Sequence, residues 1–154
     1  MIMKEDNKEV VEAEEGEVFD IELEEDILKR NQELAEENRR VLNEHGTKAI
    51  DVMGSIGSGK TSLIEALVDR LKGRYRIAMI AGDVTTTIDA DRIERHGVIS
   101  VQVNTGKECH LDANLVKKAL AKLDLEGLDL LFIENVGNLI CPAEFDLGSH
   151  MRLV

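Results

Sequence analysis

The chain has 154 residues, 43% of them hydrophobic and 32% charged, which suits one globular domain with a sizeable core. Its net charge of −12 and its 3% of aromatic residues exclude a basic, aromatic-rich surface for nucleic acid, and no stretch reaches the ~18 apolar residues of a membrane span. With an acidic N-terminus and only two cysteines, we expect a cytoplasmic protein that binds neither nucleic acid nor membranes.

The N-terminal part of the chain is acidic and then becomes helical. Its first 26 residues hold 12 acidic residues and two lysines, so they carry −10 of the net charge. Because like charges at this density repel, we expect residues 1–22 to form a disordered arm. An amphipathic helix is predicted over residues 23–45, with Glu, Arg and Asn on its polar face and Gly46 as its C-cap. The apolar positions have heptad spacing at Ile27, Leu34 and Val41, with Leu28, Ala35 and Leu42 beside them. We expect this helix to pack on its own domain, with a coiled coil as the alternative.

From residue 47 onward the patterns of strand and helix alternate. Strands are predicted at 49–53, 76–81, 98–103 and 128–133, and helices at 60–71, 88–95 and 111–123. This order is typical of βαβ units and a parallel sheet. Residues 152–154, Arg-Leu-Val, predict the start of another buried strand. We therefore expect one α/β domain at 23–154, with its core at 47–154, that is the N-terminal portion of a longer protein.

A phosphate-binding loop follows the first predicted strand. Residues 54–61, GSIGSGKT, match G-x-x-x-x-G-K-[ST] and lie between a strand and a helix, as this motif requires. Glycines let backbone N–H groups surround a phosphate at a helix N-terminus. Lys60 is predicted to reach the β- and γ-phosphates and Thr61 to bind Mg²⁺. The predicted nucleotide-binding residues are Gly54, Ser55, Gly57, Ser58, Gly59, Lys60, Thr61 and Ser62. The fold class is therefore α/β, a three-layer P-loop NTPase with a mostly parallel sheet and a preceding amphipathic helix.

Two predicted strands each end in an acidic residue. Asp83 follows the second strand and Glu134 follows the fourth, and the carboxyl ends of parallel strands meet at one edge of a sheet. A carboxylate beside a P-loop is suited to hold Mg²⁺ with its water, or to position the attacking water. We predict catalytic roles for Lys60, Asp83 and Glu134, whereas Asp89 and Asp91 are weaker candidates.

Thiol and imidazole groups occur in two further segments. Cys109 and His110 are adjacent, and Cys141 follows Glu134 in the next loop. Thiolate and imidazole donors suit Zn²⁺ or Ni²⁺, and a two-fold dimer could complete the coordination shell. The alternative is two buried cysteines and a solvated histidine.

These segments resemble the nickel-delivering P-loop GTPases of the HypB family in its archaeal form. The resemblance is carried by the P-loop and by four further blocks. These are Asn38-Arg39-Arg40, Ala81-Gly82-Asp83, the run NTGKECHLDA at 104–113 and the run IENVGNLICPA at 133–143. The last two blocks distinguish the chain from the related UreG proteins, whose metal motif is Cys-Pro-His.

The resemblance implies GTP hydrolysis coupled to homodimerisation and to nickel transfer during assembly of [NiFe]-hydrogenase. It implies Ni²⁺ or Zn²⁺ on Cys109, His110 and Cys141, with Thr61 and Asp83 on Mg²⁺ and Glu134 on the γ-phosphate side. HypA and the hydrogenase large subunit are the implied partners. The family's guanine-reading N-K-x-D element does not occur in this chain. A small-molecule P-loop kinase and a non-catalytic, metal-bridged dimerisation module are the alternatives.

Overall fold

The structure, a computed structural model, describes residues 15–83, 92–106, 109–138 and 140–154. Its elements, in chain order, are α1 (Glu15–Glu44), β1 (Lys48–Val52), α2 (Lys60–Leu71), β2 (Ile77–Asp83), β3 (Ile99–Asn104), α4 (Ala113–Leu120), β4 (Leu130–Glu134), α5 (Cys141–Glu144) and β5 (Met151–Leu153). Of the helix predicted at 88–95, residues 92–94 are helical and 88–91 lie outside the described residues, as do Asp89 and Asp91.

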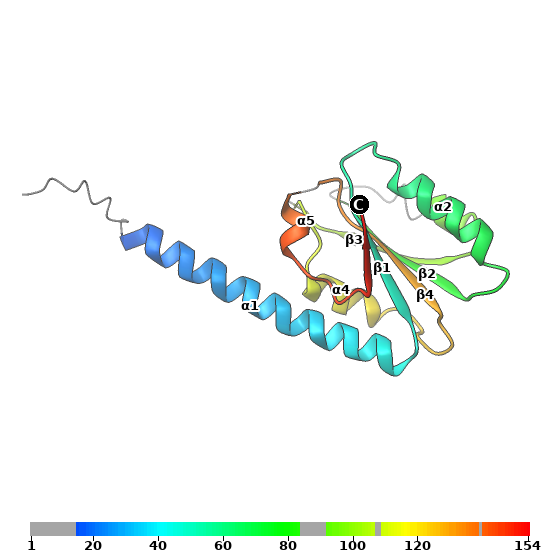
Figure 1. Ribbon diagram of the computed structural model, residues 1–154, viewed down its shortest axis with the longest axis horizontal. Coiled ribbons are helices and arrows are strands. Elements are labelled where there is room, and N and C mark those ends of the chain that lie inside the picture. The colour runs from blue at the N-terminus through cyan, green and yellow to red at the C-terminus, as the bar shows by residue number, and fades with distance from the viewer. Residues whose placement is uncertain (1–14, 84–91, 107–108, 139) are drawn as a thin grey trace, which may run out of the picture.

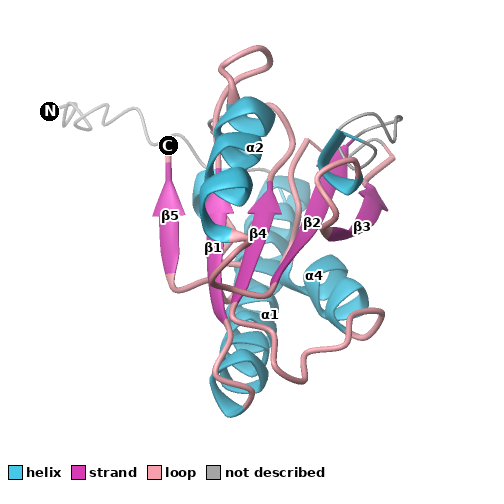
Figure 2. Ribbon diagram, turned by 90° about the vertical axis from the view of Figure 1, so that its right-hand side faces the viewer, coloured by secondary structure: helices cyan, strands magenta, loops and turns pink. Residues whose placement is uncertain are grey.

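The strands form one five-stranded, all-parallel sheet in the order β3-β2-β4-β1-β5. Figure 2 shows α2 on one face of this sheet and α1 and α4 on the other. This arrangement confirms the predicted α/β fold with three layers. The short strand predicted after residue 151 is β5, which pairs with β1 at the sheet edge. In the part of the chain that the structure describes, no helix is long and apolar enough to cross a membrane.

The core lies in two layers because successive side chains of a strand point to opposite faces of the sheet. Ile80 of β2 and Ile133 of β4 pack in the cluster that includes residues of α1 and α4. Their neighbours Met79 and Phe132 pack in the cluster that includes residues of α2. At these positions β2 and β4 are therefore apolar on both faces, as in other parallel sheets covered by helices.

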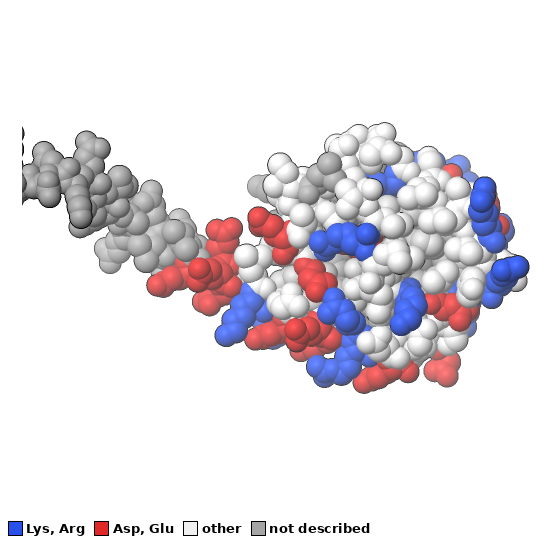
Figure 3. All heavy atoms as spheres, viewed as in Figure 1, with Lys and Arg blue, Asp and Glu red and all other residues white. Residues whose placement is uncertain are grey.

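Helix α1 is longer than predicted, and its buried face includes two asparagines in addition to apolar residues. It begins at Glu15 rather than at Leu23, because glutamates are good helix formers and negative charge is favourable near a helix N-terminus. Its first half projects from the body of the domain, as Figure 1 shows, and the exposed residues 22–26 make this part acidic in Figure 3.

The second half of α1 packs on its own domain, as expected. Ile27 and Val41 of the predicted apolar stripe are 51% and 37% exposed. Leu34, Ala35 and Leu42 of the predicted apolar face are buried as expected, together with Asn31 and Asn38. The prediction that asparagines belong to the polar face is wrong here, because these two amides bind backbone groups of other segments.

Candidate functional site

The P-loop connects β1 to α2 and bends at two glycines with positive φ. Gly57 has φ 76° and Gly59, the residue before α2, has φ 94°, a region that L-residues with side chains rarely adopt. Helix α2 begins at Lys60, so its free N–H groups face the loop. In the structure, the Lys60 ammonium donates to the carbonyl oxygens of Gly54 and Ser55 at 3.1 and 3.2 Å. This places the lysine over the loop that is to receive the phosphates.

The predicted Mg²⁺ ligand and the acid at the end of β4 lie in direct contact. The Thr61 hydroxyl donates a hydrogen bond of 2.5 Å to Oε1 of Glu134, and both side chains are buried. The hydroxyl and carboxylate oxygens are the hard donors that Mg²⁺ binds in P-loop proteins. The residues present therefore fit an Mg²⁺ ion beside the P-loop. Asp83 ends β2, and its side chain lies outside the described part of the structure.

A pocket of about 430 Å³ opens between the P-loop and the ends of β2 and β4. Its lining residues are Ile56, Gly57, Gly59, Lys60, Thr61, Ser62, Gly82, Arg92, Glu134, Asn135 and Gly137. It thus contains predicted site residues from two separate segments of the chain, the P-loop and the end of β4. Arg92 was not identified from the sequence. Its guanidinium bonds Glu65 at 2.9 Å and the Ser62 hydroxyl at 3.4 Å, and only the folded chain brings it to the P-loop.

The three predicted soft ligands form one cluster. The ligand atoms of Cys109, His110 and Cys141 all lie within 4.8 Å of one another, and all three residues are half-buried. Cys109 and His110 lie in the loop before α4, which begins after its N-cap Asp112 rather than at Leu111 as predicted. Cys141 is the first residue of α5.

The donor set of this cluster suits a borderline-soft metal. Two thiols and one imidazole are ligands of Zn²⁺ and Ni²⁺, and three protein ligands leave a position open for exchange, unlike a closed four-ligand structural site. The neighbouring Cys109 thiol, through its hydrogen bond, and burial raise the pKa of Cys141. A bound cation would reverse this effect because it stabilises the thiolate.

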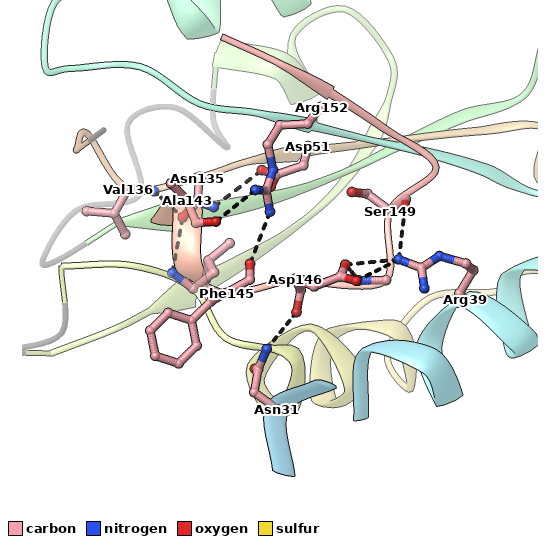
Figure 4. A network of polar contacts seen from close by, with 12 residues as sticks. Asn31, Arg39, Asp51, Asn135, Val136, Ala143, Phe145, Asp146, Ser149 and Arg152 are labelled. Atoms are coloured by element: carbon pink, nitrogen blue, oxygen red, sulfur yellow. Dashed lines mark hydrogen bonds and ion pairs between the residues drawn. The ribbon is translucent and has the colours of Figure 1, made fainter. Parts of the chain in front are cut away.

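A buried polar network lies beneath the cluster, and Figure 4 shows it. Asn135 follows Glu134; its amide oxygen accepts from the backbone N–H of Leu111 at 3.1 Å, and its amide nitrogen donates to Asp51 at 3.3 Å. Asp51, on β1, is fully buried and accepts from Arg152 Nε of β5 at 3.2 Å. Burial raises the pKa of Asp51 to about 6, since the loss of hydration outweighs the effect of Arg152 and Asn135.

Two asparagines of α1 bind the backbone of the segment after His110 and of the segment after α5. Asn31 accepts from the backbone N–H of Ala113 and donates to the carbonyl of Asp146, both at 2.8 Å. Asn38 donates to the carbonyls of Ala113 and Leu147 at 2.9 and 3.1 Å. The segments after both cysteines are therefore fastened to α1. These contacts could not be found from the sequence, where asparagines in an amphipathic helix indicate a solvated face.

The P-loop, its lysine and the Thr61–Glu134 pair at the carboxyl edge of a parallel sheet define a P-loop nucleotide-binding protein. A model of the CobW/HypB/UreG nucleotide-binding domain matches residues 48–151. The chain belongs to the CobW/HypB/UreG family.

The chain is similar to several hydrogenase maturation factors. It is 64% identical over 129 residues to a probable hydrogenase maturation factor HypB of Methanocaldococcus jannaschii, covering 84% of this chain and 58% of that protein. It is 47% identical over 133 residues to HypB of Escherichia coli K12, with 86% and 46% covered. The chain thus spans about half the length of the curated relatives it matches.

Solved structures of the same family are also similar. The crystal structure of HypB from Archaeoglobus fulgidus matches with a TM-score of 0.73 and 48% identity, over 80% of this chain and 60% of that one. The crystal structure of HypB from Helicobacter pylori in complex with nickel matches with a TM-score of 0.75 and 38% identity, over 80% and 58%. Both comparisons support the resemblance to the HypB family that the sequence indicates.

Proposed function

We propose that this chain is the nucleotide- and metal-binding part of a GTP-hydrolysing nickel metallochaperone for [NiFe]-hydrogenase maturation. The observation that carries the proposal is the position of two sites at one edge of the sheet. Glu134 ends β4, Cys141 begins α5 after it, and Cys109 and His110 follow β3, so both sites lie beyond the carboxyl ends of parallel strands. Relatives named as hydrogenase maturation factors, and a similar structure in complex with nickel, support the choice of cargo.

In this proposal the nucleotide pocket binds and hydrolyses GTP. Lys60 and the backbone N–H groups of the P-loop bind the phosphates, while Thr61 and Glu134 hold Mg²⁺, which neutralises phosphate charge when bound. Asp83, at the end of β2, is proposed as a further Mg²⁺ ligand or water-positioning group. Arg92, through its contact with Ser62, is close enough to the pocket to bind phosphate.

Contacts between the P-loop and the segment before Cys141 support coupling of the two sites. Gly54 forms a β-bridge with Asn138, and a Cβ atom at Gly137 would lie 2.5 Å from the Ile56 side chain. A shift of the P-loop on nucleotide binding must therefore displace residues that lead to α5. Such a displacement would change how tightly the cluster holds Ni²⁺ or Zn²⁺.

The open coordination of the cluster supports transfer between molecules. Three half-buried ligands from one chain leave room for a ligand of a second copy, so we propose a metal-containing homodimer. HypA and the hydrogenase large subunit are the proposed donor and acceptor of nickel. These two partners are proposed from the family resemblance, and no surface of this chain is used to argue for them.

The nucleotide half of the proposal is tested with a fluorescent GTP analogue. Wild-type protein should bind it in an Mg²⁺-dependent manner, and Thr61→Ala should remove that dependence because the hydroxyl is lost. Thr61→Ser keeps the hydroxyl and should keep Mg²⁺-dependent binding. A phosphorylated metabolite in place of free phosphate would favour the kinase alternative. Absence of nucleotide binding would favour the metal-bridged dimerisation module.

The coupling is tested by measuring Ni²⁺ and Zn²⁺ stoichiometry and molecular mass with and without nucleotide. Cys109→Ala should lower metal binding and remove its dependence on nucleotide, whereas His45→Ala is a surface control. His45 is exposed, bonds the carbonyl of Val41 and lies outside the cluster. If Cys109→Ala kept the wild-type, nucleotide-dependent stoichiometry, the proposed coupling would be wrong.

A further inference from the structure

Asp51 is a buried acid to which the proposed function gives no role. It lies on β1 three residues before the P-loop and is completely shielded from solvent. A carboxylate in such a place is costly unless cations and hydrogen bonds compensate it, and Asp51 forms an ion pair with Arg152. An isolated ion pair of this kind adds little net stability, so its partners indicate what else it does.

One branch from Asp51 leads to the segment that carries Cys109 and His110. Asn135 donates to Asp51 and accepts from the N–H of Leu111, the residue next to His110. Since Asn135 also follows Glu134, its backbone is fixed by the strand that ends in the nucleotide pocket. One amide side chain thus ties the first ligand segment to the sheet.

The other branch leads to the segment that carries Cys141. The Arg152 guanidinium, which pairs with Asp51, also donates to the carbonyls of Ala143 and Phe145 at 3.1 and 3.2 Å. The Phe145 ring in turn stacks on the His110 ring, with centroids 4.0 Å apart and an interplanar angle of 22°. The two branches therefore meet again at His110. Arginine suits this position because its rigid fork can bind three acceptors at once.

We propose that Asp51, Asn135, Arg152 and Phe145 are positioning residues that hold the two ligand segments at the spacing required for metal binding. This inference rests on the proposed function only in taking the Cys109, His110 and Cys141 cluster as the cargo site. It adds the physical elements that set the affinity of that site. Asp51 fixes Arg152, Arg152 fixes the backbone after Cys141, and Phe145 fixes the plane of the imidazole.

The test measures Co²⁺ binding without nucleotide, using the thiolate-to-cobalt absorption as the readout of ligand geometry. Arg152→Gln and Phe145→Leu should each weaken Co²⁺ affinity about 10- to 100-fold, the usual effect of losing a group that orients a ligand. Phe145→Tyr keeps the stacked ring and should therefore keep the wild-type affinity for Co²⁺. Arg76→Gln is the matched control, since Arg76 also binds a backbone carbonyl but lies before β2, at the opposite edge of the sheet.

A second readout needs no metal. Phenylarsine oxide binds two adjacent thiols, so its affinity for the apo protein reports the spacing of Cys109 and Cys141. Arg152→Gln should lower this affinity, and Arg76→Gln should not. Phe145→Leu leaves the Asp51–Arg152 pair intact, so it keeps the Co²⁺ test decisive should Arg152→Gln fail to fold.

The outcomes separate this inference from the proposed function. If Arg152→Gln and Phe145→Leu kept wild-type Co²⁺ affinity and spectrum, the positioning role would be refuted while the metal site stood. If the wild type bound no Co²⁺ or Ni²⁺, the cargo role would fail, and the arsenical titration would still show whether Arg152 sets the thiol spacing.

Discussion

The raised pKa of Asp51 leads to a prediction about how the stability of the protein depends on pH. The perturbation is Asp51→Asn, which keeps the size of the side chain and hydrogen-bonding atoms but cannot ionise. In the folded protein the pKa of Asp51 is about 6, against an ordinary value of 3.8, because burial disfavours the carboxylate. The folded state therefore binds this proton more tightly than the unfolded state does.

The sign and size of the effect follow from this difference. Below about pH 4 both states carry the proton, so Asp51 has no ionisation cost. Between about pH 4 and 6 the unfolded state loses the proton first, so the free energy of unfolding falls as pH rises. A shift of about two pKa units corresponds to about 3 kcal/mol, all of it lost by about pH 7. Relative to wild type, Asp51→Asn should gain this amount over the same range.

Urea unfolding of both proteins, at a series of pH values from about 4 to 7, measures the difference directly. Contributions of other titrating groups are common to both proteins and cancel. Asp26→Asn, at an exposed aspartate of α1, controls for the loss of a negative charge. A difference between wild type and Asp51→Asn that stays constant with pH would refute the reasoning. A change of opposite sign would mean that the pairing with Arg152 outweighs the burial of Asp51.

Two further predictions concern how α1 and the segment before β5 pack together. Gly148→Ala should lower the free energy of unfolding by at least about 2 kcal/mol, because φ is +92° and a Cβ atom would lie 2.5 Å from a carbonyl oxygen of α1. Thermal unfolding measures this loss. Gly73→Ala is the control, because a Cβ atom there would have no neighbour within 4 Å. Asn38→Ala should lower the free energy of unfolding by about 1–3 kcal/mol, because two buried carbonyls lose their donor. Urea unfolding measures this loss, with Asn114→Ala at an exposed asparagine as the control. Equal stability of the two variants would contradict this role of Asn38.

Much of the site was predictable because its chemistry is encoded in short stretches of sequence. The P-loop combines glycines, Lys60 and Thr61 in eight consecutive residues, and a strand and a helix flank it as the motif requires. The contact between Thr61 and Glu134 follows from parallel topology, which brings the carboxyl ends of β1 and β4 together. Cys109, His110 and Cys141 could be predicted as candidate metal ligands because thiol and imidazole groups occur in two short segments. Their spacing alone left burial of the two cysteines as an alternative.

The contacts that hold the site together were not predictable. Asn31 and Asn38 have the spacing of a polar helix face, and only the packing of α1 shows that they bind backbone groups. Arg152 gave no signal in the sequence beyond its place in the strand predicted at 152–154. Its pairing with Asp51 depends on β5 lying beside β1, which is a matter of strand order.

The sequence by itself therefore determined the class of fold, the candidate phosphate site and the candidate metal ligands, since glycine conformations, helix dipoles and donor types are local properties of the chain. Only the tertiary structure decided that Cys109, His110 and Cys141 converge within 4.8 Å and that Asp51, Asn135 and Arg152 connect their segments. The physical reason is that these contacts join residues far apart in the chain. Their geometry depends on the strand order β3-β2-β4-β1-β5, which no local pattern specifies.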